Sequence, residues 1–378
     1  MYAKLVSSGS AGYPATIAAI NNLRGVLAGT ITSTSQLNAS GHNQGLSYIG
    51  GTMPTTGIYT VNTTSTATGN EGSGSFYLDK YHYAKGQTAG YTPFRRIYFY
   101  VDYLYCWRMN MFDSAAGNGV PGANGNHYWG DHSNTTYNYG RVPVNQSQQA
   151  PAYWKEMHII MNDTTLAFQL ITTGLDTEVD YGTYVFCDLE YSATIDNYAY
   201  SGNSRYCPTI MGWWMWSNCM EKANGLAAAG ANGAHHAIAN PQFIDQYGAY
   251  RNSEISDQGN EHYGYHAATH ENKPMLEPQC RNRIYQIPQA NGNFVHQLVP
   301  MTYKGHTDDI DNYGDPRRGR LMNWYRTSDG IGWSGDILTE GATQYRIFRV
   351  HKSGDEVLTS STWNACYAFP EENVPFGG

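Results

Sequence analysis

Three histidines at four-residue spacing are the first group in the sequence whose type and spacing suggest chemistry. His262, His266 and His270 would lie on one face of a helix, where imidazole nitrogens bind Zn²⁺ or Ni²⁺. Gly264 and the surrounding Asn, Tyr and Thr residues disfavour a helix, however. We therefore interpret this segment as a polar loop with solvated or hydrogen-bonded histidines, and a metal site is the alternative.

An acidic run at residues 308–315 offers the oxygen ligands that Ca²⁺ prefers, with Asp309 and Asp311 as candidate ligands. The run departs from the EF-hand pattern, because Tyr313 takes the place of a third ligand and no closing Glu follows. Three arginines between 317 and 320 are placed to neutralise these carboxylates. We expect an acidic turn rather than a calcium site.

Paired carboxylates on strands form the third group, because glycoside hydrolases use such pairs. Glu156, Asp188, Glu190 and Asp196 lie on or near expected strands, but a chain with 31 Asp and Glu residues offers many pairs. The sequence patterns of serine hydrolases, zinc proteases, P-loop proteins and dinucleotide-binding proteins are not found in it. We expect a protein without catalytic activity or cofactor.

Aromatic side chains are the fourth group, with 32 Tyr, 9 Trp and 11 Phe in 378 residues. Aromatic rings anchor protein interfaces and form stacking platforms for sugars. Trp213, Trp214 and Trp216 alternate along an expected strand, so some of them fill a core. Tyr128, Trp129 and Tyr137 lie on a long loop and are interface candidates.

The composition describes a folded chain with a polar surface that carries few charges. Charged residues make up 14% of it, against roughly 25% in an average globular protein. The net charge of −8 argues against nucleic acid as a partner, and no apolar run is long enough to span a membrane. The N-terminal residues lack the apolar core of an export signal, and the six cysteines form no C-x-x-C pair. We expect reduced thiols and assembly in a cytoplasm.

One helix is expected over residues 10–29, followed by a long stretch of strands. Ile17, Leu23 and Leu27 recur at helical spacing, and Gly29 ends the pattern. This apolar stripe packs either on the chain's own domain or on a neighbouring subunit, so the three residues are also interface candidates.

Apolar runs rich in β-branched and aromatic residues predict the strands. Asn162-Asp163 separates two such runs and predicts a hairpin. We expect residues 95–107 to form one central strand, and the tail 370–378 to extend over a neighbour. The expected strands are 75–83, 95–107, 154–161, 164–172, 181–191, 207–216, 294–299, 335–339, 344–351 and 364–369.

These elements predict a mainly β fold, a β-sandwich or jelly-roll-like arrangement of sheets with long inserted loops and one short N-terminal helix. The loops at 113–152 and 223–239 are rich in Gly and Asn, and residues 241–292 are polar and irregular. We divide the chain into an N-terminal helix and Thr/Ser-rich arm at 1–70, a central β-sandwich at 71–222, a loop-rich insertion at 223–292, and a C-terminal β segment with its tail at 293–378.

Several segments resemble accessory virion proteins of large tailed bacteriophages. They are Met1-Tyr-Ala-Lys-Leu-Val-Ser-Ser-Gly-Ser10, Trp154-Lys-Glu-Met-His-Ile-Ile-Met-Asn-Asp-Thr-Thr165, Phe186-Cys-Asp-Leu-Glu-Tyr191 and residues 345–372. The resemblance implies a non-catalytic, β-rich subunit of the tail, baseplate or neck, or a capsid-surface (decoration) protein, assembled in the host cytoplasm. It also implies other virion proteins as partners and a homo-oligomer in the particle, and it transfers no site residues.

A receptor-recognition protein that binds a glycan of the host surface is the alternative. Exposed Trp and Tyr side chains would then line a groove for the sugar, whereas a structural subunit would bury its aromatic loops against neighbours.

Overall fold

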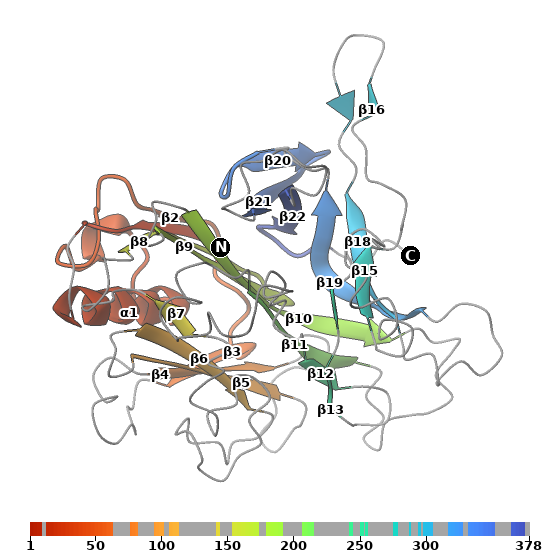
Figure 1. Cartoon of the computed structure of the whole chain (residues 1–378), viewed down its shortest axis with the longest axis horizontal. Coiled ribbons are helices and arrows are strands. Elements are labelled where there is room, and N and C mark those ends of the chain that lie inside the picture. The colour runs from red at the N-terminus through yellow and green to blue at the C-terminus, as the bar shows by residue number, and fades with distance from the viewer. Residues whose placement is uncertain are drawn as a thin grey trace, which may run out of the picture.

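In the residues that it describes, the computed structural model is mainly β, with one α-helix and sheets that are antiparallel apart from one short strand pair (Figure 1). This confirms the predicted fold class. The structure describes residues 1–9, 13–62, 76–81, 94–101, 106–112, 141–143, 153–173, 179–191, 206–214, 242–244, 250–252, 254–255, 275–278, 287–288, 294–295, 298–304, 317–327, 332–351 and 364–374.

A 13-stranded sheet dominates the fold. Its main path runs β14-β15-β18-β19-β10-β9-β8-β1-β2, β11 pairs with β10, and β22, β21 and β20 continue from β19. Its strands come from all four of the predicted segments, so the predicted boundaries do not separate independent sheets. The strands are β1 (Tyr2–Val6), β2 (Tyr48–Gly50), β8 (Tyr153–Met161), β9 (Thr165–Thr173), β10 (Val179–Tyr191), β11 (Tyr206–Trp214), β14 (Glu254–Ile255), β15 (Met275–Pro278), β18 (Val299–Lys304), β19 (Arg317–Thr327), β20 (Ile337–Glu340), β21 (Thr343–His351) and β22 (Asn364–Pro370).

The predicted hairpin between β8 and β9 is confirmed. Its turn is fixed by the side chain of Asn162, whose Oδ1 accepts hydrogen bonds from the backbone N–H of Thr164 at 3.1 Å and of Thr165 at 2.9 Å. An Asn side chain that bonds the backbone two or three residues on is a common way to close a turn. The same side chain donates from Nδ2 to the carbonyl oxygen of Pro370 at 3.0 Å, which ties the hairpin to the C-terminal strand.

A smaller sheet of five strands lies on the other side of the helix (Figure 1). Residues 95–107 were predicted as one strand, and this was wrong. The run is divided between β5 and β6, which pair as antiparallel neighbours with Val101 opposite Trp107. No Gly, Pro or Asn stands between the two strands, so the sequence does not signal the reversal. The strands of this sheet are β3 (Tyr59–Asn62), β4 (Phe76–Tyr81), β5 (Phe94–Val101), β6 (Cys106–Phe112) and β7 (Arg141–Pro143).

Other differences from the predicted strands concern short or polar segments. The segment 241–292, predicted to be irregular, contributes strands of two to four residues, and the strand predicted at 294–299 is divided between β17 and β18. Strand β19 was not predicted, because three arginines open it and turn-forming residues precede it. The remaining elements are the 3₁₀ turn η1 (Thr34–Gln36), β12 (Gln242–Ile244), β13 (Tyr250–Asn252), β16 (Ile287–Pro288) and β17 (Phe294–Val295).

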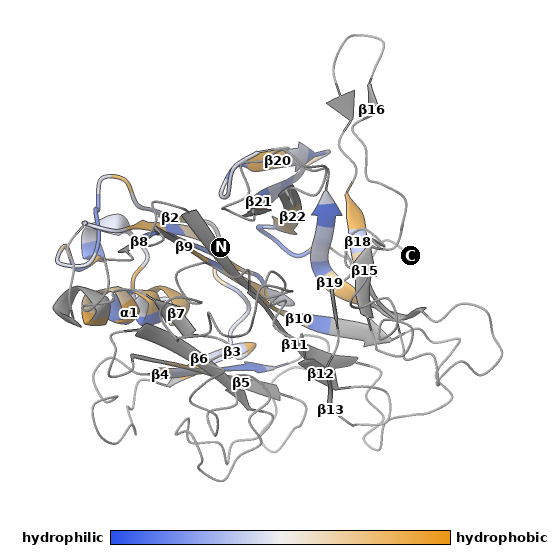
Figure 2. Ribbon diagram, viewed as in Figure 1, coloured by the Kyte–Doolittle hydropathy of each residue, from blue (hydrophilic) through white to orange (hydrophobic). Residues whose placement is uncertain are grey.

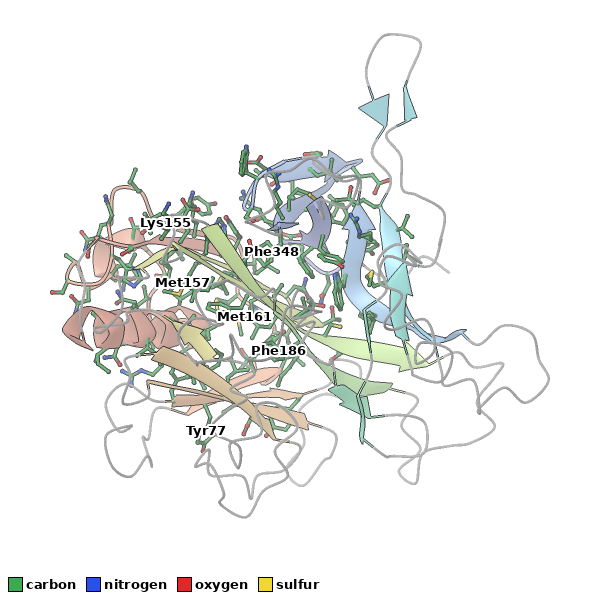
Figure 3. All side chains as sticks on the ribbon, in the orientation of Figure 1. Tyr77, Lys155, Met157, Met161, Phe186 and Phe348 are labelled. Carbon is green, nitrogen blue, oxygen red and sulfur yellow. The ribbon has the colours of Figure 1, made fainter. Side chains whose placement is uncertain are left out.

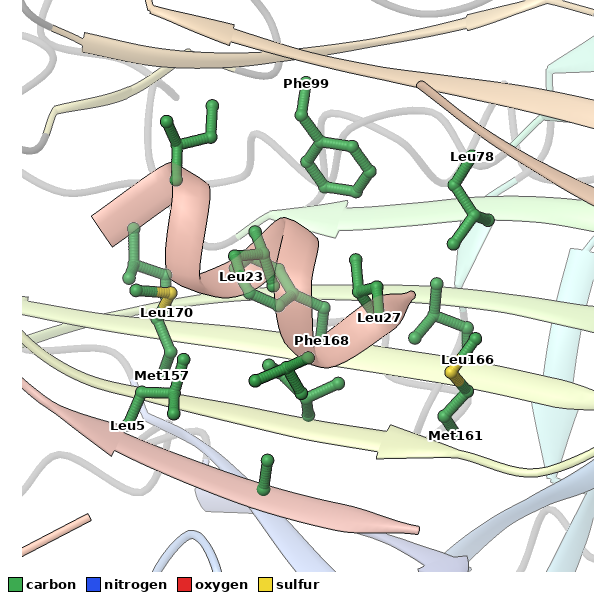
Figure 4. Close-up of a cluster of buried hydrophobic side chains, with 14 of the residues drawn as sticks. Leu5, Leu23, Leu27, Leu78, Phe99, Met157, Met161, Leu166, Phe168 and Leu170 are labelled. Atoms are coloured by element: carbon green, nitrogen blue, oxygen red, sulfur yellow. The ribbon is translucent and has the colours of Figure 1, made fainter. Parts of the chain in front are cut away.

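Helix α1 (Tyr13–Leu27) lies in the core between the two sheets. Hydrophobic and hydrophilic residues alternate along it (Figure 2). Leu23 and Leu27 are buried, with Phe99 and Leu78 of the small sheet on one side and residues such as Phe168 of the large sheet on the other (Figure 4). The helix therefore packs on its own chain, one of the two predicted alternatives.

This packing corrects the prediction of Leu23 and Leu27 as interface residues, because the core already covers both side chains. Ile17 is partly buried against the same core. The prediction that the C-terminal tail extends over a neighbour is corrected for its residues up to 374. Asn373 donates from Nδ2 to Asp163 at 2.8 Å, and the backbone N–H of Val374 donates to Asn323 at 3.3 Å. Those residues contact their own chain.

The large sheet has an apolar and a polar face where β1, β8 and β9 meet. Met157 and Met161 point toward the helix, and Phe186 of β10 lies in the same interior (Figure 3). The opposite face carries His158 and Gln169. Strand β21, which belongs to the same sheet through β22, lies over this face. There Phe348 packs edge-on against His158, and Gln169 donates to the carbonyl oxygen of Arg349 at 2.9 Å.

Candidate interaction surface

A row of polar side chains crosses the face of the large sheet that β21 covers. The hydroxyl of Tyr2 hydrogen-bonds Nδ1 of His158 at 2.8 Å, and Nε2 of His158 lies 3.0 Å from Glu156. Lys4 then forms an ion pair with Glu156 at 3.1 Å. Strand pairing explains the row, because Tyr2 and Lys4 alternate on β1 while Glu156 and His158 alternate on β8.

Burial controls the protonation of this row. It lowers the pKa of His158, which favours the neutral ring. With its proton on Nε2, the neutral ring donates to Glu156 and accepts at Nδ1 from the Tyr2 hydroxyl, so both hydrogen bonds are satisfied. Burial also raises the pKa of the Tyr2 hydroxyl. The hydrogen bond from His158 lowers the pKa of Glu156 to about 2. Each polar side chain of the row thus has a hydrogen-bond or ion-pair partner within the row.

Arg346 connects the buried row to the surface. Its guanidinium carbon lies 3.9 Å from the ring centroid of Tyr2 and 5.9 Å from that of Tyr48. Its Nε donates to Glu371 at 2.6 Å and its Nη1 to the carbonyl oxygen of Gly335 at 2.8 Å. A guanidinium that stacks on rings and donates to fixed acceptors is held in one orientation.

Gly335 belongs to a tight turn that lies directly on the row. The backbone N–H of Asp336 donates to the carbonyl oxygen of Trp333 at 3.0 Å, and the carboxylate of Asp336 accepts from the N–H of Trp333 at 2.8 Å. Gly335 has a φ of +91°, and a Cβ there would stand 2.5 Å from the hydroxyl of Tyr2. Only glycine combines this positive φ with room for the Tyr2 hydroxyl. Trp333, in the same turn, is exposed to solvent.

Among the described residues, four large apolar side chains stay exposed, two at β2 and two at β20 and the turn before it, and we call them the apolar rim. They are 47% to 64% exposed. Tyr48 and Ile337 flank Arg346, the first through its ring and the second as its partner across β20 and β21. One face of the Trp333 ring stacks on the guanidinium of Arg349, at 4.5 Å from the ring centroid. The residues of the rim are Leu46, Tyr48, Trp333 and Ile337.

The predicted site residues fall largely outside this surface. Tyr128, Trp129 and Tyr137 lie outside the described residues, as do the candidate metal ligands His262, His266, His270, Asp309 and Asp311. Within the described part of the chain, no three His, Cys, Asp or Glu side chains gather as a metal site.

The candidate carboxylates Glu156 and Asp188 do not form a pair. Strand register places their side chains on opposite faces of the large sheet, where Glu156 bonds His158 and Asp188 bonds Lys80. The side chain of Glu190 is not described, and Asp196 lies outside the described residues. Cys187 and Cys366 are buried thiols.

Sequence reading did not find the apolar rim. Trp333 stands between glycines at 332 and 335, a pattern typical of a tight turn that exposes its aromatic residue, and this was the available signal. Tyr48 and Leu46 alternate at the edge of a polar arm, which is a much weaker indication.

Comparison with known proteins assigns no relative, since neither a family model nor a curated protein matches the chain. Among the helices that the structure describes, none is long and apolar enough to cross a membrane. What this surface binds is therefore inferred from its own residues. An exposed Trp and an exposed Tyr, each beside an arginine, are the combination enriched at the energetic centres of protein interfaces.

Proposed function

We propose that the protein is a structural subunit of a tailed-bacteriophage virion, in the tail, baseplate or neck, which holds neighbouring subunits through aromatic and amide-rich surfaces. The observation that carries the proposal is the apolar rim. Tyr48 and Ile337 both lie beside Arg346, and exposed apolar side chains that lie together are typical of a site that another protein covers. The phage resemblance of the sequence, together with a charge content of 14%, supports the virion as the setting.

The internal construction of the rim supports an assembly role. Tyr48 and Trp333 are each positioned by an arginine, and Arg346 is itself fixed by Glu371 and Gly335. Side chains that are held in place before contact lose little conformational freedom on binding. The buried row beneath them gives the surface a rigid base.

The test measures whether the rim drives association. A chain that carries both Tyr48→Ser and Trp333→Ser should keep its circular dichroism spectrum and its thermal unfolding midpoint. It should associate with itself or with its neighbouring virion proteins at least about tenfold more weakly, in sedimentation velocity and in particle incorporation. Glu340→Ser is the matched control, because this exposed residue lies on the same hairpin as Ile337. Full incorporation of the double variant into particles would contradict the proposal.

A glycan-binding, receptor-recognition protein is the second candidate, and the exposed indole of Trp333 favours it. One face of the ring stacks on Arg349, and sugars stack on the open faces of such rings. In that case the isolated chain binds glycans on an array and Trp333→Ala abolishes the binding, while the subunit contacts survive. A capsid decoration protein is the remaining alternative. Locating the chain in purified particles distinguishes a position on the capsid surface from one in the tail, baseplate or neck.

A further inference from the structure

Lys80 and Asp188 bring a primary amine against a carboxylate in the interior between the two sheets. Lys80 lies on β4 of the small sheet and Asp188 on β10 of the large sheet, 108 residues further along the chain. The amine nitrogen Nζ contacts the carboxylate oxygen Oδ1. The two side chains are 1% and 0% exposed, so the pair is shielded from bulk water.

Both residues occupy positions that the strand pattern gives to the apolar core. Phe76 and Leu78 precede Lys80 at alternate positions of β4, and Phe186 precedes Asp188 on β10. Alternate residues of a strand face the same side, and all five side chains are buried. Two charges in such a place are costly to desolvate, and their mutual contact is what offsets that cost.

The surroundings hold the amine over the carboxylate. Lys80 Nζ also lies 3.4 Å from the carbonyl oxygen of Tyr81 and 5.6 Å from the ring centroid of Tyr59. The Tyr59 hydroxyl donates to the carbonyl oxygen of Asn162 at 2.7 Å. Burial, and after it the charge of Asp188, raise the pKa of Tyr59 well above its usual range, so the tyrosine stays neutral. The amine therefore has contacts with Tyr81 and Tyr59 as well as with Asp188.

We propose that Lys80 and Asp188 condense into an isopeptide bond that joins the two sheets covalently. A proton first passes from the ammonium to the carboxylate across their contact, which gives an amine and a carboxylic acid. The amine nitrogen then attacks Cγ of Asp188, and a C–N bond forms. The C–O bond to the acid hydroxyl breaks, a second proton moves from the nitrogen to that hydroxyl, and one water molecule is released. The reaction needs neither an oxidant nor a reductant.

Two physical factors favour the amide here and not at the surface. In water, hydration of the separate ions opposes condensation, whereas burial removes this hydration from both groups. A fixed contact also gives an amine and a carboxyl group an effective concentration far above that of free reactants. The Lys4–Glu156 pair, whose side chains are 33% and 31% exposed, has neither advantage.

Mass spectrometry of the full chain tests the proposal. The folded protein, denatured just before measurement, should weigh less than its sequence by one water molecule. A proteolytic digest should contain a branched peptide that joins the β4 and β10 segments through Lys80 and Asp188. Lys80→Arg retains the positive charge without a primary amine and should restore the full mass, whereas the matched control Lys4→Arg should keep the deficit of one water.

Two results would overturn the inference. The first is a wild-type chain that is folded by circular dichroism and has its full sequence mass, with the two segments in separate linear peptides. The second is a mass deficit that persists in Lys80→Arg or maps to another pair. The branched-peptide measurement uses the wild-type chain, so it decides the question even where Lys80→Arg fails to fold.

Discussion

The hydroxyl of Tyr2 bonds Nδ1 of His158 at 2.8 Å in the interior, and so joins two adjacent strands that are 156 residues apart in the chain. Tyr2→Phe removes this hydroxyl and leaves the buried imidazole nitrogen without its donor. We expect the free energy of unfolding to fall by about 1–3 kcal/mol, measured by urea denaturation. Tyr48→Phe is the control, because its ring is 47% exposed, and it should change stability by less than about 0.5 kcal/mol. Equal losses in the two variants would show that the buried bond contributes nothing.

Acid should destabilise the fold, and His42 is one cause. Burial lowers the pKa of this side chain from 6.5 to about 4. The unfolded chain therefore binds a proton that the folded chain excludes between pH 6.5 and 4, so stability falls as the pH drops through this range. The expected loss is on the order of 3 kcal/mol. Urea denaturation at several pH values measures it, and His42→Gln should flatten the dependence.

Two further groups change stability in the same direction. The lowered pKa of His158 adds a loss below pH 6.5, and Glu156, with a pKa lowered from 4.5 to about 2, adds one below pH 4.5. A stability that is constant or rises on acidification from pH 6.5 would contradict the burial of both histidines.

A methyl group at Gly335 should be poorly tolerated. A Cβ there would stand 2.5 Å from the Tyr2 hydroxyl and 2.8 Å from Cε1 of His158, on a backbone with a φ of +91°. Gly341 is a matched control, since its φ is also positive, at +60°, and nothing lies within 4 Å of an added Cβ. We expect Gly341→Ala to cost about 1 kcal/mol and Gly335→Ala about 1–3 kcal/mol more, by thermal or urea unfolding. Equal costs would mean that the turn does not press on the polar row.

The position of the helix between the sheets predicts a strong effect of truncation at Leu23. This side chain is fully buried, and Leu23→Ala should reduce the free energy of unfolding by about 2–5 kcal/mol. Leu46→Ala makes the same chemical change at a side chain that is 64% exposed, and should cost less than about 0.5 kcal/mol. A small effect at Leu23, measured by urea denaturation, would contradict the buried helix.

The sequence alone predicted the elements whose signals lie within a few neighbouring residues. The Asn162-Asp163 turn marked the hairpin of β8 and β9, and the spacing of Ile17, Leu23 and Leu27 marked the helix. Strand β1 was not recognised, because its pairing with β8 depends on residues more than 150 positions away. Strand β19 was missed because its three arginines near residue 317 obscure the apolar part that follows, including the buried Trp324.

The site was less predictable than the fold, because it is made of contacts between distant segments. Asp188 was noted as an acid on a strand, but no local pattern pairs it with Lys80. An alternation of Phe76, Leu78 and Lys80 does indicate a lysine at a core position, which is a readable signal that a buried partner exists. The rim residues Tyr48 and Trp333 belong to segments far apart in the sequence, which Arg346 links by contacting the Tyr48 ring and the Gly335 turn.

The interior placement of β1 has a consequence for synthesis on the ribosome. This strand pairs with β2 along one edge and with β8, which ends at Met161, along the other, and the amine of Met1 donates to the carbonyl oxygen of Glu371. The second edge of β1 therefore stays unpaired until β8 has been translated. High contact order of this kind slows folding and prolongs the exposure of unpaired edges. The nascent chain should therefore depend on chaperones that bind extended apolar segments.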